Sequence, residues 1–315
     1  MTVNLFGDDL FGKPIEQQSN STLMKEFTIP PFSVLDARQG YWQERKKAWK
    51  SLGIQGELKN LPSGAFQCGQ GSVNHKVIKR SDSASMFDPV LSEICCNWFC
   101  PSGGQIVDPF AGGSVRGIVA TTLGFKYWGC DIRGKQIVSN REQAEIITPE
   151  HQPEWVVGDA MEVLDDAPDA DFIFSCPPYG DLERYSDDPK DISTMDYHAF
   201  IAAYRRIILR ASKRLKENRF ACFVVGDFRN KKSGCYRGFV NDTSVAFSSA
   251  GMGLYNEAIL TTMLSAAPLR AGEPFRKSRK LCKAHQNVLV FVKGDPKLAT
   301  ANIEKEKYHG RVQNL

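Results

Sequence analysis

Residues 105–118 read QIVDPFAGGSVRGI, and this stretch decides the fold. A short apolar run ends in Asp108, a glycine turn follows, and the next residues have the composition of a helix. Glycines let a backbone turn sharply and approach a ligand closely, and the first turn of a helix presents N–H groups that lack partners. The stretch therefore predicts a strand, a ligand-binding turn and a helix. It fits neither Gly-x-Gly-x-x-Gly nor Gly-Lys-Ser/Thr, which excludes a P-loop.

Outward from this stretch, the chain alternates strand-like runs with helix-length segments, a pattern typical of a parallel α/β sheet. The strand candidates are residues 105–108, 126–131, 155–158, 171–175, 219–226, 257–264 and 287–293. Helix-length segments separate the first five, and residues 199–215 carry an apolar stripe at helical spacing. A basic stretch rather than a clear helix separates the last two. A short helix is also expected over residues 41–52, docked through Trp42 and Trp49.

Acidic residues follow two further strands at the same predicted edge. Asp131 ends the second strand, where a carboxylate can accept both hydroxyl protons of a ribose. Asp159 follows the third strand, where it can accept a hydrogen bond from an adenine amino group. Any one such aspartate commonly caps a turn or a helix. Three consecutive strand ends with an acid or a glycine turn, together with the binding of ligands at the carboxyl edge of open α/β sheets, predict a nucleoside site.

The fourth strand runs into Cys176-Pro177-Pro178-Tyr179. Two prolines fix the backbone and remove two N–H donors, so the segment is expected to be rigid, with carbonyls free to accept hydrogen bonds. Tyr179 is expected to be exposed and to offer a flat face to an aromatic ligand. A Pro-Pro-Tyr sequence in an arbitrary loop would indicate little. Here it lies at a strand end that follows the glycine turn, and this position indicates a functional segment.

The motifs DPFAGGS and SCPPY resemble those of S-adenosylmethionine-dependent DNA methyltransferases that modify exocyclic amino groups, adenine N6 or cytosine N4. The likeness covers roughly residues 87–293, and a weaker likeness to phage and prophage methylases covers residues 29–54. It implies a Rossmann-like methyltransferase fold, with a seven-stranded, mostly parallel sheet and an antiparallel last strand. It also implies S-adenosyl-L-methionine as cofactor, duplex DNA with a flipped base as partner, and a restriction-modification setting in a bacterial cytoplasm.

The resemblance also implies roles for single residues. The cofactor would be held by Asp108, Phe110, Gly112, Gly113 and Asp131, with Asp159 at the adenine. The catalytic segment would be Cys176, Pro177, Pro178 and Tyr179, with Tyr179 stacking on the target base. The chain departs from the family pattern at Ser114, where a last glycine is usual, and at Cys176, where Asp, Asn or Ser is expected and where a thiol is only a weak acceptor.

Cys176 keeps a second chemistry open. Methylation of cytosine C5 needs a thiolate that attacks C6, although the families that do this have the order Pro-Cys and not Cys-Pro. Two further alternatives are a methyltransferase for RNA or protein amino groups and a binding module that retains the cofactor fold without catalysis.

Charge is informative only where it clusters, because the net charge of the chain is +4. The span from Pro268 to His285 has one acid, Glu273, and is predicted to contact nucleic-acid phosphates. Its cations are Arg270, Arg276, Lys277, Arg279, Lys280 and Lys283. A solvated surface loop is the alternative interpretation of this span.

The remaining features set the expected domain organisation. The chain is divided into a polar tail (1–28), an N-terminal extension that could touch DNA (29–86), a methyltransferase domain (87–295) with a basic insertion (265–286), and a C-terminal tail (296–315). No apolar run reaches the roughly 18 residues of a membrane-spanning helix, so no membrane association is expected. The chain has 9 cysteines and no Cys-x-x-Cys pair, which predicts reduced, buried thiols and no zinc site.

Overall fold

The computed structural model describes residues 22–56, 86–180, 188–262 and 267–303. An 8-stranded sheet forms the centre, in the order β1-β7-β8-β6-β5-β2-β3-β4. Its strands are β1 (Val34–Asp36), β2 (Gln105–Asp108), β3 (Lys126–Asp131), β4 (Glu154–Val157), β5 (Ala170–Ser175), β6 (Leu215–Val225), β7 (Gly253–Thr261) and β8 (His285–Lys293). Among the strand pairings of this sheet in the described residues, those of β8 with β6 and β7 are antiparallel, and the rest are parallel. The mostly parallel sheet with an antiparallel last strand is therefore confirmed.

The predicted number of seven strands is wrong, because β1 adds an eighth at the edge of the sheet. This strand pairs in parallel with β7, Val34 opposite Ile259 and Leu35 opposite Leu260. The extension that precedes the glycine turn thus contributes to the sheet itself.

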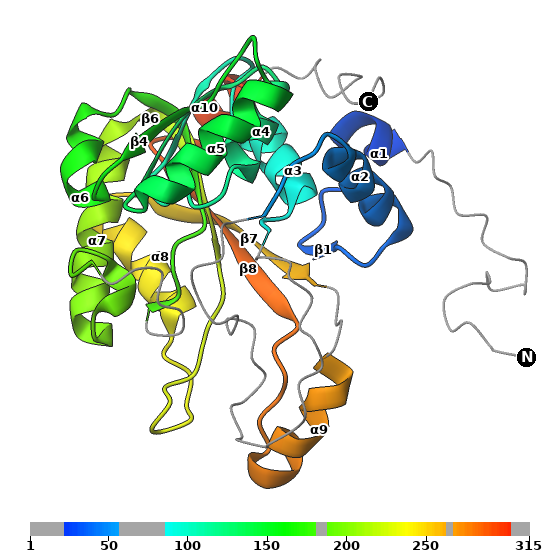
Figure 1. Ribbon diagram of the computed structural model, residues 1–315, viewed down its shortest axis with the longest axis vertical. Helices are drawn as coiled ribbons and strands as arrows, with labels where there is room; N and C mark the ends of the chain where they lie inside the picture. The colour runs from blue at the N-terminus through cyan, green and yellow to red at the C-terminus, as the bar shows by residue number, and fades with distance from the viewer. Residues whose placement is uncertain (1–21, 57–85, 181–187, 263–266, 304–315) are drawn as a thin grey trace, which may run out of the picture.

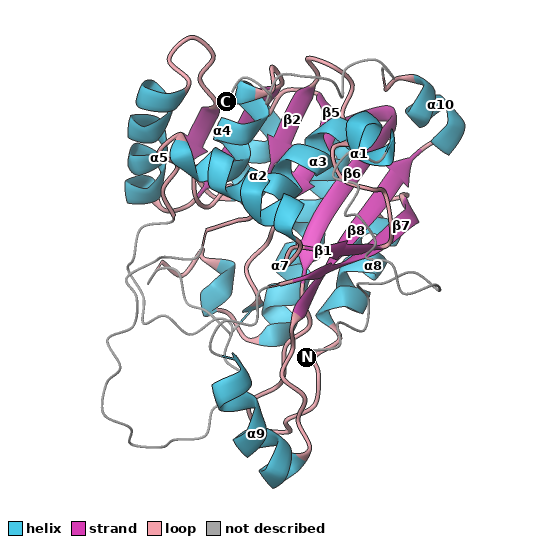
Figure 2. Cartoon of the chain, turned by 90° about the vertical axis from the view of Figure 1, so that its right-hand side faces the viewer, coloured by secondary structure: helices cyan, strands magenta, loops and turns pink. Residues whose placement is uncertain are grey.

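Helices cover both faces of the sheet (Figures 1 and 2). Their bounds are α1 (Thr22–Phe27), α2 (Gly40–Ser51), α3 (Pro89–Phe99), α4 (Val115–Thr122), α5 (Gly134–Ile147), α6 (Ala160–Val163), α7 (Tyr197–Arg214), α8 (Phe239–Ser249), α9 (Ala267–Ser278) and α10 (Pro296–Ala301). One apolar cluster joins α2, α3, α4 and α5 to one face, and a second joins α6, α7 and α8 to the other. Neighbouring residues of β5 alternate accordingly, since Phe172 and Phe174 belong to the first cluster and Ile173 to the second.

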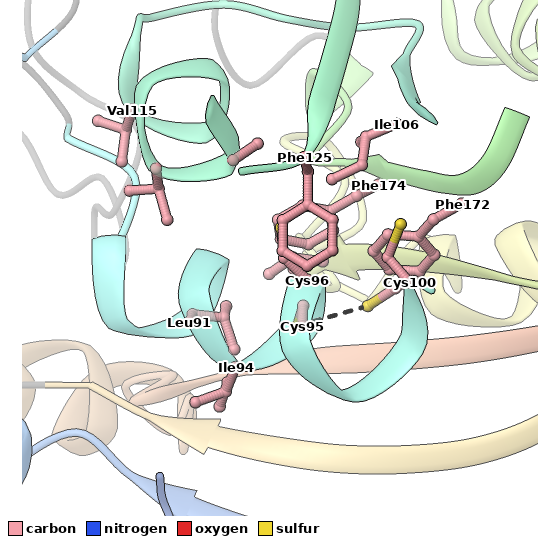
Figure 3. Packing of buried hydrophobic residues seen from close by; sticks show 14 of the residues in the cluster. Leu91, Ile94, Cys95, Cys96, Cys100, Ile106, Val115, Phe125, Phe172 and Phe174 are labelled. Carbon is pink, nitrogen blue, oxygen red and sulfur yellow. Dashed lines mark hydrogen bonds between the residues drawn. The ribbon is translucent and has the colours of Figure 1, made fainter. Parts of the chain in front are cut away.

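Helix α3 lies against β5 and β6 in the first cluster (Figure 3). Asp88 caps its first turn by accepting hydrogen bonds from the N–H groups of Val90 and Leu91. Its cysteines are buried among phenylalanines, and Cys95 Sγ lies 3.8 Å from Cys222 Sγ on β6. Burial raises the pKa of the Cys95 thiol. The expectation of buried thiols is confirmed for this helix.

The helix expected over residues 41–52 is α2, and its two tryptophans are fully buried, as predicted. Burying side chains of this size contributes on the order of 2 kcal/mol each. Two cations of the same helix form ion pairs with α3, Arg45 with Glu93 and Lys46 with Asp88. The charged groups of Arg45 and Lys46 are therefore directed toward the start and middle of α3.

The chain ends differ in part from the predicted tails. Residues 22–27 of the expected N-terminal tail form α1, and Phe27 O accepts a hydrogen bond of 2.9 Å from Trp98 Nε1. Helix α10 lies inside the expected C-terminal tail and packs against β6. The rest of both tails, residues 1–21 and 304–315, and residues 57–85 of the extension lie outside the described residues.

The basic insertion contains a helix where none was clear from the sequence. Helix α9 lies apart from the sheet beyond the strand ends that carry Thr261 and His285 (Figures 1 and 2). The connection from β6 to α8 projects on the same side (Figure 1). Across the described ranges, we find no helix with both the length and the apolar character needed to cross a bilayer.

Candidate cofactor and target site

Asp108, at the end of β2, is fully buried and accepts four hydrogen bonds. Its Oδ2 accepts from Arg116 Nε at 2.6 Å and from Tyr127 Oη at 2.8 Å. Its Oδ1 accepts from Ser175 Oγ at 2.6 Å and from Phe110 N at 3.1 Å. Because both carboxylate oxygens are used inside the protein, Asp108 positions the turn. A direct contact of Asp108 with the cofactor stays a prediction.

Arg116 is the partner that the sequence analysis missed. Besides its bond to Asp108, its terminal nitrogen Nη2 donates to the carbonyls of Phe110 at 2.6 Å and Ala111 at 3.0 Å. Burial by itself lowers the pKa of Arg116, but the adjacent carboxylate of Asp108 outweighs it, and the net pKa is raised. The guanidinium also lies 4.7 Å from the ring centre of Phe87. An arginine within the apolar helical run VRGIVATT was the available signal.

Gly112 and Asp131 come together as predicted. Gly112 has φ of 53°, a left-handed conformation that favours glycine. Its N–H donates to Asp131 Oδ2 at 3.0 Å, and its carbonyl accepts from Asn140 Nδ2 at 2.8 Å. Asn140 is held in turn by Gln136 at 2.9 Å. The Asp131 carboxylate also accepts from the backbone and the guanidinium of Arg133. Helix α5 thus fixes the turn through amides that sequence reasoning did not single out.

Ser114 stands where the family pattern has a glycine, and the structure explains why this is tolerated. Its φ and ψ of −69° and −18° are right-handed helical, so no glycine is required there. The buried hydroxyl donates to Gln143 Oε1 at 3.0 Å, and the same oxygen accepts from Gln55 N at 2.9 Å. The serine therefore connects the turn to α5 and to the N-terminal extension.

Asp159 and Phe110 flank this turn. Asp159 caps α6 through a bond of 2.8 Å from Met161 N. The neighbouring Gly158 N donates to the carbonyl of Asp131 at 3.1 Å, which brings the ends of β3 and β4 together. The ring of Phe110 is half-buried and lies 6.0 Å from the ring of Tyr204.

The segment from Cys176 to Tyr179 follows β5 next to this turn. Ser175 points inward to Asp108, whereas Cys176 is partly exposed. Tyr179 Oη lies 4.0 Å from Cys176 Sγ and accepts a hydrogen bond of 2.7 Å from Gln286 Nε2. The ring of Tyr179 packs near those of Phe228 and Phe239, and the residue is only 8% exposed. The expected exposed platform at Tyr179 is therefore wrong in this structure, because these phenylalanines cover it.

Gly226, at the end of β6, lies between Tyr179 and Lys283. A Cβ at Gly226 would lie 3.6 Å from Lys283 Cε and 3.8 Å from Tyr179 Oη. Lys283 Nζ is 3.0 Å from His285 Nε2. Burial lowers the pKa of Lys283, and burial together with the charge of Lys283 lowers the pKa of His285. One predicted nucleic-acid contact thus lies beside the predicted catalytic segment.

The other cations of the basic span have different surroundings. Arg276 and Lys277 both form ion pairs with Glu273, at 3.2 Å and 2.9 Å. Arg279 lies over the ring of Phe275, 5.3 Å from its centre. The side chain of Arg270 lies outside the described residues.

A cavity of about 500 Å³ lies on another part of the molecule. Phe32, Leu35, Trp98 and Val290 are among its lining residues, and no predicted site residue lines it. The candidate site is therefore the glycine turn and the strand ends beside it.

No family model matches the chain, and no curated protein matches it. Solved structures that are similar include TrmN from Thermus thermophilus, with 15% identity over 66% of this chain and a TM-score of 0.44. The chain covers 49% of TrmN, about half of its length. Magnesium protoporphyrin IX methyltransferase from Synechocystis with bound SAM is 11% identical, with a TM-score of 0.41. The match covers 65% of this chain and 76% of that protein. The [4+2]-cyclase SpnF is 12% identical, with a TM-score of 0.47, and the match covers 66% of this chain and 82% of SpnF.

These likenesses concern the fold. The chain has the α/β fold that the sequence predicted, with eight strands in one mixed, mostly parallel sheet.

Proposed function

We propose that this protein is an S-adenosylmethionine-dependent methyltransferase that acts on the exocyclic amino group of a flipped DNA base, adenine N6 or cytosine N4. The observation that carries the proposal is the hydrogen bond between Asp108 and Ser175. It joins the glycine turn after β2 to the strand that leads into Cys176-Pro177-Pro178-Tyr179. A turn suited to the cofactor and a segment suited to the target base are thereby held on adjacent strands.

The residues of the turn fit the cofactor. Gly112 has no side chain and a left-handed φ, so a ligand can approach its backbone closely. Asp131 places a carboxylate at the end of β3, where it can accept the hydroxyl protons of a ribose once it exchanges its bonds to Arg133. Asp159 is the acid expected at the adenine. S-adenosylmethionine supplies an electrophilic methyl group with its own leaving group.

The catalytic segment would position the amine. The Pro177 carbonyl and the Cys176 side chain would draw the N–H protons and leave the nitrogen lone pair in line with the methyl group. Cys176 is partly exposed and so is available to a substrate. For the ring of Tyr179 to stack on a flipped base, it has to move away from Phe228 and Phe239. Its hydroxyl beside Cys176 is the part of the side chain suited to the base in the present arrangement.

The test is transfer of a labelled methyl group to duplex DNA, single-stranded DNA, RNA and protein, followed by digestion and mass analysis of the labelled product. The proposal expects label on adenine N6 or cytosine N4 of DNA, and less label with the Asp131→Ala variant when the cofactor is below saturation. Label confined to RNA or protein contradicts the DNA assignment. An absence of label on every acceptor, from protein that binds the cofactor, favours the non-catalytic alternative.

A second candidate is methylation of cytosine C5 with the Cys176 thiolate as nucleophile. Its support is the partly exposed thiol at the predicted catalytic position. The same mass analysis separates the two, because the label then lies on carbon C5.

A further inference from the structure

Two segments far apart in the sequence bring cations to the same place beside the catalytic segment. In the connection from β6 to α8, Arg229 and Tyr236 face each other as an antiparallel bridge. The guanidinium carbon of Arg229 lies 4.0 Å from the centre of the Tyr236 ring. The chain between α9 and β8 brings Lys283 Nζ to 5.9 Å from the same ring centre. Both segments lie beyond the same edge of the sheet (Figure 1).

Lys280 extends this arrangement. A Cβ on Gly234 would lie 2.9 Å from Lys280 Nζ, so the ammonium group is close to the tip of the same connection. Gly234 O in turn accepts a hydrogen bond of 3.0 Å from Arg229 Nη1. Arg229, Tyr236, Lys280 and Lys283, which we call the Tyr236 cluster, therefore combine three cations with one tyrosine that is 45% exposed.

Within the described residues, the three cations of the Tyr236 cluster form no ion pair. The carboxylate that acts on Lys283 is Asp227, and its Oδ1 accepts from the backbone N–H groups of Phe228 and Gly238. Like charges that are brought together repel, and the repulsion is relieved when an anion binds. Arg276 and Lys277 differ, because Glu273 already neutralises both in part.

The stacking of Arg229 on Tyr236 suits a phosphate ligand. A guanidinium that lies on an aromatic ring keeps its N–H donors in its own plane, directed away from the ring. One donor is used by Gly234 O, and the others can form paired bonds to phosphate oxygens. Tyr236 is then a positioning residue for Arg229.

The Tyr236 cluster also lies close to Tyr179, in the segment proposed to hold the target base. Lys283 Cε and Tyr179 Oη lie within 4 Å of the same point beside Gly226. Cations at this place would reach the phosphates next to the flipped nucleotide, not those of a distant part of the duplex.

We propose that the Tyr236 cluster binds the DNA phosphates that flank the target base. This inference rests on the proposed function, and it assigns Arg229 and Tyr236, which the basic span of the sequence does not include. It also divides that span: Lys280 and Lys283 contact phosphate, whereas Arg276 and Lys277 do not.

The experiment measures binding of a duplex oligonucleotide by fluorescence anisotropy as a function of salt concentration. The variant Arg229→Gln/Lys280→Gln is compared with Arg276→Gln/Lys277→Gln, because each removes one arginine and one lysine. The slope of log K against log salt is expected to fall by about 0.9 for each phosphate that the first variant no longer binds, and to stay unchanged in the second. Tyr236→Phe is expected to bind like the wild type, whereas Tyr236→Leu is expected to reduce the slope because Arg229 is no longer held in place. Thermal unfolding verifies that every variant is folded.

An unchanged slope in Arg229→Gln/Lys280→Gln overturns the inference, and so does an equal decrease in the control pair, which indicates a general effect of charge. If the wild type methylates DNA and the cluster variants have the same slope of log K against log salt as the wild type, the phosphate-binding inference fails and the proposed function stands. If the wild type shows no salt-dependent binding to DNA and methylates RNA instead, the proposed function and the inference both fail.

Discussion

Arg116 and Asp108 form a buried ion pair at the base of the glycine turn, with Nε 2.6 Å from Oδ2. The pair connects three parts of the site. Asp108 bonds to Ser175 on β5, while Arg116 bonds to the carbonyls of Phe110 and Ala111 in the turn. A buried pair is tolerated when its remaining hydrogen-bonding groups are satisfied. Here the backbone of the turn satisfies Arg116, and Tyr127 and Ser175 satisfy Asp108.

Arg116→Met is expected to lower the free energy of unfolding by about 3–5 kcal/mol, because it leaves the Asp108 charge buried without its partner. Arg116→Lys is expected to restore part of this stability but not the turn, since an ammonium group cannot reproduce the planar fork of bonds. Urea unfolding and calorimetric titration with S-adenosylmethionine measure the two effects. The matched control is Arg210→Met, whose exposed ion pair with Asp165 should contribute less than about 1 kcal/mol. Equal stability of Arg116→Met and wild type would show that the pair does not support the turn.

The features that could be predicted from the sequence are those encoded locally. The glycine turn, Asp131 at the end of β3 and the helix with Trp42 and Trp49 each follow from a short pattern of residues. Strand β1 does not, because it has three residues and forms by pairing with β7 near the other end of the chain. Its residues Val34 and Leu35 carry too short an alternation to be distinguished from a loop.

Two properties of the site depend on distant side chains, which a local sequence pattern does not reveal. Tyr179 follows two prolines, a setting that favours exposure, but Phe228 and Phe239 from beyond β6 cover its ring. Asp108 has the position of a ligand contact, but the buried Arg116 and Ser175 use its oxygens. Whether a strand-end acid faces a ligand or the core is decided by such partners, which periodicity does not reveal.

Asp131→Ala is expected to weaken binding of S-adenosylmethionine while the protein stays folded. It removes a carboxylate that accepts from Gly112 N at 3.0 Å and is proposed to accept from the ribose. Removing bonds to a charged group costs about 1.5–3 kcal/mol, or roughly ten- to a hundredfold in affinity. Calorimetric titration measures this, with Asp166→Ala, an exposed acid, as the control. Unchanged affinity in Asp131→Ala would remove this residue from the site.

Asp171, the second residue of β5, is expected to make stability dependent on pH. Burial raises the pKa of its carboxyl, but the N–H of Gln105 and the cations of Lys216 and Arg219 outweigh burial, so the net pKa is lowered. A carboxyl with a lowered pKa contributes stability above its unfolded value of about 3.9 and loses it as the pH falls through the folded pKa. The gap in unfolding free energy between wild type and Asp171→Asn should therefore be full at pH 7 and shrink below about pH 4.

Urea unfolding at a series of pH values measures this gap. Asp169→Asn is the control, because the ion pair of Asp169 with Arg214 is exposed and should contribute less than about 1 kcal/mol. A gap that stays constant down to about pH 2 contradicts the role assigned to the charge of Asp171.

Cys176→Ser decides the chemistry. If the target is an exocyclic nitrogen, the side chain at this position needs only to be small and to accept a hydrogen bond, and a hydroxyl is a better acceptor than a thiol. Activity should then be kept or raised. If the target is cytosine C5, the thiolate is the nucleophile, and serine without an adjacent base should abolish turnover. We expect retained activity, because Pro177-Pro178-Tyr179 follows this residue as it follows Ser or Asp in the amino methyltransferases that the motif resembles. A serine variant that binds cofactor and DNA but is inactive, together with a covalent adduct of the wild type on fluorinated cytosine, would establish the C5 route instead.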